Sequence, residues 1–279
     1  MNYRHAYHAG NFADVLKHAS LVAVLLHLRK KETPFAVIDC HGGRGLYDLG
    51  SEQAKKTGEA DAGIGRLLQR DALPGVLQDY AEIVRGFGPS AYPGSPLIAA
   101  RLLRDKDRLV AVEKHPEEYA ALASVLSNNR RVRLIQGDYV TELTKLLPPP
   151  QRRGLVLIDP PYEKDGEFAE ATKSLIAAHQ RFANGIFLFW YPAKERPAVE
   201  ASAGELLTAG IKALVRIEID VGRLPPIEGR EGRLSATGLL VVNPPFGFAD
   251  SMREIMPFLE QHLAQGPGAS GRVHVLAER

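Results

Sequence analysis

The stretch Asp159-Pro160-Pro161-Tyr162 joins an acid, two prolines and an aromatic ring directly after an apolar run, Gly154 to Ile158. An apolar run of this length is typical of a buried parallel strand, which would place the four residues at its carboxyl end. Asp159 and the Pro160 carbonyl could accept the two hydrogens of an amino group on a flat ring such as adenine. Tyr162 could stack on that ring, as aromatic side chains do with unpaired bases. Because proline fixes φ and removes backbone donors, we interpret the stretch as a rigid frame that aims an amino nitrogen at an electrophile.

A second copy of the pattern, Asn243-Pro244-Pro245-Phe246, follows the apolar run Gly238 to Val242. Adjacent prolines commonly mark nothing more than a turn. The motif by itself therefore leaves both interpretations open, and the surrounding elements must decide which copy is chemical.

Composition places the chain among ordinary globular proteins. Its 279 residues carry a net charge of +2 and give a pI of about 8.6. Basic clusters at 29–31, 130–133 and 152–153 permit a polyanionic partner, but each is equally typical of a solvated loop. The single Cys40 excludes an internal disulfide, and no apolar run approaches the roughly 20 residues of a membrane span. We expect a cytoplasmic protein with no membrane partner.

Apolar spacing predicts alternating strands and helices. From Phe12 it predicts a helix that lasts to about Lys30. The predicted strands are 35–40, 108–113, 132–136, 154–158, 185–190, 213–219, 237–243 and a short run at 273–276. The predicted later helices are 97–103, 116–127, 140–147, 167–181, 196–209 and 249–264. This alternation indicates a mostly parallel sheet with helices on both faces.

Residues 51–93 interrupt the alternation. They contain helical patches near 64–68 and 76–84 and no convincing strand, so we interpret them as a small helical insertion subdomain. Residues 1–50 and 94–279 would then form one domain. Ser95 is the expected N-cap of the helix that follows.

Acids recur at the predicted carboxyl ends of four successive strands, where open α/β sheets bind ligands. Asp39 precedes a glycine loop that contains Gly43 and Gly45, and Asp159 ends the fourth strand of the series. Glu113 could accept both hydroxyls of a ribose, and Asp138 could meet an adenine amino group or cap a helix. The series resembles the Rossmann-like class I methyltransferases that use S-adenosylmethionine. That resemblance implies a seven-stranded sheet whose last main strand is antiparallel, which would put Asn243 at the opposite edge.

The segment from Asn2 to His18 resembles the start of the bacterial ribosomal RNA large-subunit methyltransferase J family. Further matches lie at 39–45, 92–96, 152–163, 190–192 and 236–245, so the resemblance spans nearly the whole chain. It implies methylation of the exocyclic N6 of an adenine in 23S ribosomal RNA, with S-adenosyl-L-methionine as the cofactor. The residues expected at the cofactor are His18, His41, Gly43, Ser95, Glu113, Asp138, Tyr139 and Asp159. Those expected near the target nucleotide are Tyr3, His5 and Lys17, with Asp159, Pro160 and Tyr162 in the catalytic motif.

Two further features of the sequence concern the site. Tyr139 stands where a small residue would leave more room beside the cofactor's adenine. Several histidines invite a metal hypothesis, but we expect no metal because the chain has no Cys cluster and no His-Glu-x-x-His pattern. The alternatives left open are a DNA adenine methyltransferase, a protein-glutamine or small-molecule methyltransferase, and a non-catalytic RNA-binding protein.

Overall fold

Eight strands form one sheet in the order β10-β8-β9-β7-β6-β1-β4-β5 in the computed structural model, which describes residues 8–194, 196–224 and 233–278. The strands are β1 Ala36–Asp39, β4 Arg108–Glu113, β5 Val132–Gln136, β6 Gly154–Ile158, β7 Ile186–Pro192, β8 Leu214–Asp220, β9 Ala236–Val242 and β10 Ser270–Ala277. The strands from β5 across to β7 pair in parallel, whereas β9 pairs antiparallel with both β7 and β8. The mostly parallel sheet and its reversed strand confirm the expected architecture.

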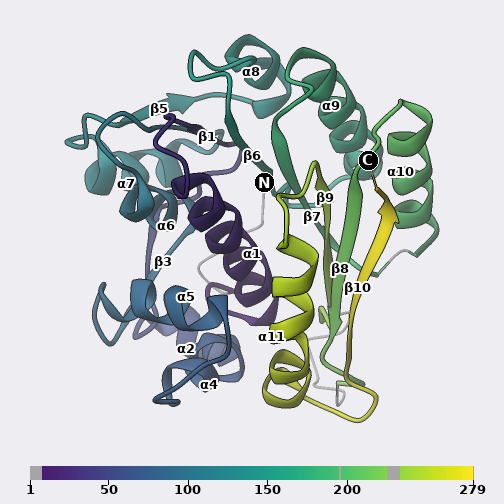
Figure 1. Ribbon diagram of the computed structural model, residues 1–279. Helices are drawn as coiled ribbons and strands as arrows, with labels where there is room; N and C mark the ends of the chain where they lie inside the picture. Colours follow the sequence, from purple (N-terminus) through teal and green to yellow (C-terminus); the bar gives the residue numbers. More distant parts are fainter. Residues whose placement is uncertain (1–7, 195, 225–232, 279) are drawn as a thin grey trace.

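Helices cover both faces of this sheet (Figure 1). They are α1 Phe12–Arg29, α6 Ser95–Leu102, α7 Pro116–Leu126, α8 Tyr139–Leu146, α9 Glu167–Arg181, α10 Arg196–Thr208 and α11 Phe248–Leu263. Residues of α1, α6, α7 and α11 join one apolar core, and residues of α8, α9 and α10 join a second core. Successive side chains of a strand point to opposite faces. Leu155 and Leu157 of β6 therefore enter the first core while Val156 and Ile158 enter the second, which explains the unbroken apolar run.

The prediction of seven strands is wrong by one. β10 pairs antiparallel with β8 and forms an edge of the sheet. Along β10 every residue is at least partly exposed, and polar residues such as Arg272 and His274 interrupt the apolar ones. An edge strand that is only half buried leaves a weak apolar pattern, so the sequence predicted only its short central run.

Helix α1 brings the start of the described chain into the core. The Asn11 side chain accepts hydrogen bonds from the backbone N–H groups of Ala13 and Asp14, which satisfies the first turn. Most of the helix is buried, and it lies beside α11 on the same face of the sheet (Figure 1). Its first turn is thereby held against the carboxyl ends of the strands.

The stretch 51–93 is mostly helical, as predicted. It forms α2 Glu52–Thr57, α3 Glu59–Ala62, α4 Ile64–Leu68 and α5 Val76–Arg85, which lie together in Figure 1. The expectation that it holds no strand is wrong, because β3 Ala91–Pro93 pairs antiparallel with β2 Leu46–Asp48. Each of these strands has three residues, which is too short to leave a periodic signal. The division into a domain and an insertion subdomain stays a prediction.

The helix after this stretch begins earlier than expected. Ser95 is the first residue of α6, and Gly94 occupies the N-cap position, without a side-chain hydrogen bond. The prediction that Ser95 caps this helix is therefore wrong. The first turn of α6 is instead initiated by Gly94 and stiffened by Pro96.

Gly63 packs closely against the backbone of Gly10 and Asn11, directly before α1. A Cβ at this position would lie 2.1 Å from the Gly10 carbonyl oxygen, which also accepts the N–H of Ile64. We expect Gly63→Ala to lower the free energy of unfolding by about 2 kcal/mol, because backbone must move to admit the methyl group. Denaturant unfolding of the purified variant measures this change.

Gly204 provides the control, because it lies in α10 and a Cβ there would meet nothing within 4 Å. Gly204→Ala should stabilise the protein by up to about 1 kcal/mol through helix propensity. Equal effects of the two substitutions would contradict the steric argument.

The second Pro-Pro copy lies at the opposite edge of the sheet from Asp159, as expected from the reversed direction of β9. The Asn243 side-chain amide donates to the carbonyl oxygens of Ala183 and Gly185, and Phe246 is 97% exposed. The second copy therefore has a structural role at the end of β9 and lies away from the carboxyl ends of the parallel strands. Within the described residues, no helix combines the length and hydropathy that crossing a bilayer requires.

Candidate active site

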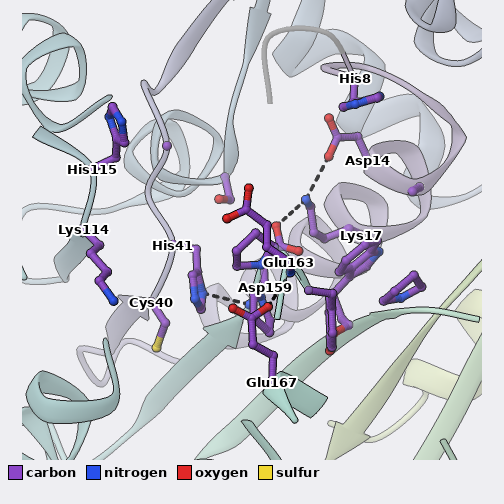
Figure 2. Close-up of a pocket in the computed structure, with 18 of the residues that line it drawn as sticks. His8, Asp14, Lys17, Cys40, His41, Lys114, His115, Asp159, Glu163 and Glu167 are labelled. Atoms are coloured by element: carbon purple, nitrogen blue, oxygen red, sulfur yellow. Dashed lines mark hydrogen bonds and ion pairs between the residues drawn. The ribbon is translucent and has the colours of Figure 1, made fainter. Parts of the chain in front are cut away.

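A cavity of about 1050 Å³ opens at the carboxyl ends of the parallel strands. Its walls come from the first turns of α1 and from the loops after β1, β4, β5, β6 and β7. All expected cofactor residues line it, namely His18, His41, Gly43, Ser95, Glu113, Asp138, Tyr139 and Asp159, together with Lys17, Pro160 and Tyr162. Figure 2 shows Lys17 and His41 on opposite sides of Asp159. Tyr3 and His5 lie outside the described residues.

The glycine loop after β1 is locked to the end of β4. Glu113 accepts the N–H of Gly43 through Oε2 and the N–H of His115 through Oε1, each at 2.7 Å. Gly43 has a φ of 56°, a conformation that favours glycine. Burial raises the pKa of Glu113 above its ordinary value, although these N–H donors oppose the shift. The N–H groups of Gly43 and His115 therefore hold the Glu113 carboxylate in one fixed orientation at the cavity wall.

His41 bridges the first and fourth strands of the acidic series. Its Nδ1 accepts the backbone N–H of Asp159 at 3.1 Å, so the ring proton of the neutral form lies on Nε2. The ring packs against Tyr139, with centroids 4.4 Å apart. Burial lowers the pKa of His41 to about 4, so the ring is neutral at physiological pH.

Two buried side chains, Asp39 and His18, make hydrogen bonds around the cavity. Asp39 is buried and accepts the N–H of His41 through Oδ1, and burial raises the pKa of Asp39 to about 6. The side chain of Ser95 and the N–H of His41 oppose that rise. His18 is also buried, and its Nδ1 lies 2.7 Å from the hydroxyl of Tyr92. Strand β3, which carries Tyr92, thus fixes a residue of the cavity wall.

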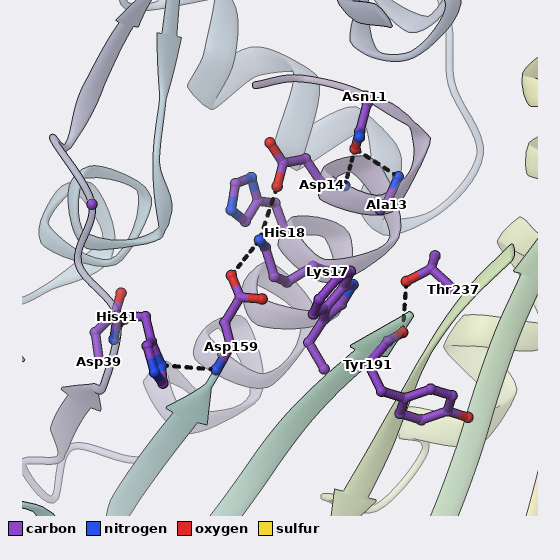
Figure 3. A network of polar contacts seen from close by, with 12 residues as sticks. Asn11, Ala13, Asp14, Lys17, His18, Asp39, His41, Asp159, Tyr191 and Thr237 are labelled. Atoms are coloured by element: carbon purple, nitrogen blue, oxygen red, sulfur yellow. Dashed lines mark hydrogen bonds and ion pairs between the residues drawn. The ribbon is translucent and has the colours of Figure 1, made fainter. Parts of the chain in front are cut away.

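Lys17 lies between two carboxylates. Its Nζ is 2.5 Å from Oδ2 of Asp159 and 2.9 Å from Oδ1 of Asp14 (Figure 3). Burial alone would lower the pKa of Lys17, but the two acids hold it well above its ordinary value. Its ammonium is also 5.7 Å from the ring centre of Trp190 on β7. Lys17 is therefore a permanent cation whose position is set from three sides.

The loop after Asp159 turns sharply at Tyr162, which has a φ of 53°. The Tyr162 hydroxyl donates to the Trp190 carbonyl oxygen at 2.7 Å, and its ring packs near Phe168 and Trp190. Pro160 is buried beneath this turn. The aromatic ring is thus tethered to β7 at one side of the cavity.

Asp138 caps helix α8, one of the two roles predicted for it. Its Oδ1 accepts the N–H of Val140, and its Oδ2 lies 2.6 Å from the Lys114 ammonium. Lys114 is exposed, and its ion pair with Asp138 therefore lies at the rim of the cavity. Tyr139 follows directly, so the bulky residue that departs from the expected pattern lies against His41.

Sequence reasoning missed Asp14 and Trp190 as parts of this site. The i,i+3 spacing of Asp14 and Lys17 on one face of a helix could have indicated the first of them. Trp190 stands near the carboxyl end of a predicted strand, which could have indicated the second. Among the residues that the structure describes, no group of three His, Cys, Asp or Glu side chains could hold a metal ion.

The depressed pKa of His41 has a consequence for stability. An unfolded chain takes up a proton on this side chain below pH 6.5, whereas the folded protein resists it down to about pH 4. Stability should therefore fall as the pH drops from 6.5 to 4, by up to about 1.4 kcal/mol per pH unit from this group. His41→Asn, which keeps an acceptor for the Asp159 N–H, should remove that part of the slope.

Denaturant unfolding of both proteins at a series of pH values tests this expectation. The carboxylates that also titrate in this range are common to both proteins, so the difference between the curves isolates His41. Parallel curves would show that the His41 ring does not stay neutral in the folded protein between pH 6.5 and 4.

Comparisons with known proteins agree over nearly the whole chain. A family model described as "Ribosomal RNA large subunit methyltransferase D, RlmJ" matches residues 32–276. "Ribosomal RNA large subunit methyltransferase J" of Escherichia coli (strain K12) is 39% identical over 279 residues, covering 99% of this chain and 98% of that protein. The protein of the same name from Haemophilus influenzae is 38% identical over 275 residues and covers 96% of each chain. The crystal structure of protein LPL1258 from Legionella pneumophila is 33% identical, covers 96% of this chain and 98% of that one, and has a TM-score of 0.86.

Proposed function

The chain belongs to the RlmJ family of ribosomal RNA large subunit methyltransferases, and we propose that it transfers a methyl group from S-adenosylmethionine to the exocyclic N6 of an adenine in 23S ribosomal RNA. The observation that carries the choice of an amino nitrogen is the position of Asp159. It lines the cavity at the carboxyl end of β6 and is followed by two prolines and Tyr162. Substrate and family together favour a cytoplasmic enzyme.

The donor set of the cavity fits S-adenosylmethionine. Glu113, held by two backbone N–H groups, has lone pairs left for the two hydroxyls of a ribose. The rings of His41 and Tyr139 offer a flat surface near Asp138, where an adenine could lie. When bound, the cofactor supplies an electrophilic methyl group on a sulfonium. These assignments to individual residues are proposals.

Asp159, Pro160 and Tyr162 would bind and orient the target adenine. The target adenine leaves its stack and enters beside Tyr162, which packs on its face. Asp159 and the Pro160 carbonyl accept the two amino hydrogens and so turn the nitrogen lone pair toward the methyl group. Transfer is an in-line displacement in which positioning dominates. The nitrogen gains positive charge as it is methylated and then releases a proton to water, so no strong base is needed beforehand.

The alternatives differ in acceptor or in chemistry. A DNA adenine methyltransferase would share the catalytic motif, and a protein-glutamine or small-molecule methyltransferase would present another planar nitrogen. A non-catalytic RNA-binding protein would retain RNA without adding methyl groups. The family match over residues 32–276 favours the ribosomal RNA acceptor over all three.

Mass mapping of adenine methylation in ribosomal RNA, from cells with and without this chain, tests the proposal. We expect one N6-methyladenosine of 23S RNA to disappear with the chain and to return when the chain is restored. An unchanged map would overturn the ribosomal assignment. Paired assays of the purified protein on RNA and DNA oligomers separate the DNA alternative, since we expect incorporation only into RNA.

A further inference from the structure

We propose that Asp14 is a positioning residue for methyl transfer, which orients the Lys17 ammonium against Asp159 and offsets its charge. The inference rests on the proposed function, because it concerns the charge that develops on the acceptor nitrogen. Asp14 itself would touch neither substrate nor cofactor. Its effect would pass through Lys17 to the side chain that holds the amino group.

The geometry fixes Asp14 from both ends of its carboxylate. Oδ1 lies 2.9 Å from the Lys17 ammonium, and Oδ2 accepts the N–H of Gly10 at 2.9 Å. Asp14 is 1% exposed and Lys17 is 4% exposed, so water screens the pair little. Figure 3 shows the three groups in a line, with Lys17 between the two acids. The ammonium therefore meets Asp159 from one direction only.

Capping of α1 does not account for the ion pair between Asp14 and Lys17. The Asn11 side chain already accepts the N–H groups of Ala13 and Asp14 at the helix start. One oxygen of Asp14 serves the helix start by accepting the N–H of Gly10, whereas the other is directed to the Lys17 ammonium. A buried acid that pairs with the cation of the active site is more than the helix start requires.

Charge balance gives the arrangement a role in the reaction. Methyl transfer moves a positive charge from the cofactor sulfur to the acceptor nitrogen, which lies next to Asp159. Asp14 offsets the charge of the Lys17 ammonium, so Asp159 keeps a net negative charge beside that nitrogen and favours the movement. Without Asp14 the Lys17–Asp159 pair is neutral, and the ammonium opposes the developing charge in a site of low dielectric.

Asp14→Asn removes the charge and keeps the size of the side chain. We expect kcat to fall about 10- to 100-fold, as for the loss of one electrostatic contribution at the transition state. The KM for RNA and the Kd for S-adenosylmethionine should stay within about 3-fold, because both oxygens of Asp14 are already engaged by Lys17 and Gly10. An unchanged kcat, or a loss confined to KM, would overturn the proposal.

A double-mutant cycle separates positioning from a merely structural effect. If Asp14 acts only through the ammonium, Lys17→Gln and the double variant Asp14→Asn/Lys17→Gln should have equal kcat values, within about 2-fold. A further 10-fold drop in the double variant would overturn the proposal. This comparison also holds if Asp14→Asn alone fails to fold, because neither protein in it buries an ammonium.

Asp250 offers a matched control. It is also the third residue of its helix, α11, and pairs with the cation three positions later, Arg253, at 2.7 Å. Unlike Asp14, it is exposed and outside the cavity wall. Asp250→Asn should leave kcat unchanged. A loss of kcat equal to that of Asp14→Asn would show that any acid in a first helical turn has this effect.

Discussion

Replacing Asp159 by alanine should lower the rate of methyl transfer to RNA by about 10³-fold while the protein stays folded. The proposed chemistry needs this carboxylate to accept an amino hydrogen and to aim the nitrogen lone pair. The fold does not need it, because Lys17 keeps Asp14 as a partner at 2.9 Å and the bond to His41 is donated by the backbone N–H of residue 159. Methyl incorporation from labelled S-adenosylmethionine measures the rate, and denaturant unfolding confirms that the variant is folded.

The second Pro-Pro copy supplies the control for Asp159. Asn243 holds an equivalent place in its motif but lies at the other edge of the sheet, where it donates to the carbonyls of Ala183 and Gly185. Asn243→Ala should reduce stability and leave the rate per folded molecule unchanged. Full methylation by a folded Asp159→Ala protein would overturn the catalytic assignment, whatever the control shows.

Replacing Glu113 by glutamine should weaken binding of S-adenosylmethionine about 10- to 100-fold. The carboxylate is expected to accept ribose hydroxyls, and a hydrogen bond to a charged group contributes about 1.5–3 kcal/mol. Glutamine keeps the size of the side chain but turns a donor toward the N–H of Gly43 or of His115, both of which need an acceptor. The glycine loop should therefore loosen as well. Calorimetric titration with the cofactor measures the change in Kd.

Glu260 is a matched control for Glu113, since it too accepts a glycine N–H, that of Gly271, at 2.7 Å. It lies on α11, outside the cavity wall. Glu260→Gln should therefore change stability but leave the cofactor Kd as in the unaltered protein. An unchanged Kd in Glu113→Gln would remove Glu113 from the cofactor site.

Most strands could be predicted because their signal is local. β4, β5 and β6 begin and end at the residues expected from their apolar runs, and α1 begins at Phe12. β6 is buried and free of polar side chains at every position, so its ends are visible in the sequence, whereas β4 and β5 keep an apolar centre with polar residues among or beside it. β2 and β3 could not be predicted in this way, since each has three residues and exists only through pairing with the other.

Which residues line the site could be predicted better than which of them contact one another. Each acid of the series stands at the end of a strand, and the direction of the strands brings the acids to one edge. Lys17 was expected near the target nucleotide, but its ion pair with Asp159 joins residues 142 positions apart. Asp14 entered the site only through that pair. The catalytic and binding roles of the individual residues stay predictions.

The sequence by itself determined the order of strands and helices, the acids at the strand ends and the family, because these depend on residue types and short spacings. The tertiary structure alone decided that β10 completes an eighth strand, that Lys17 lies between two carboxylates, and that His41 is neutral. The physical reason is that strand pairing at an edge, ion pairing and burial all depend on groups far apart in the chain. Such contacts leave no periodic trace in the sequence, and they set the charge and orientation of the groups around Asp159.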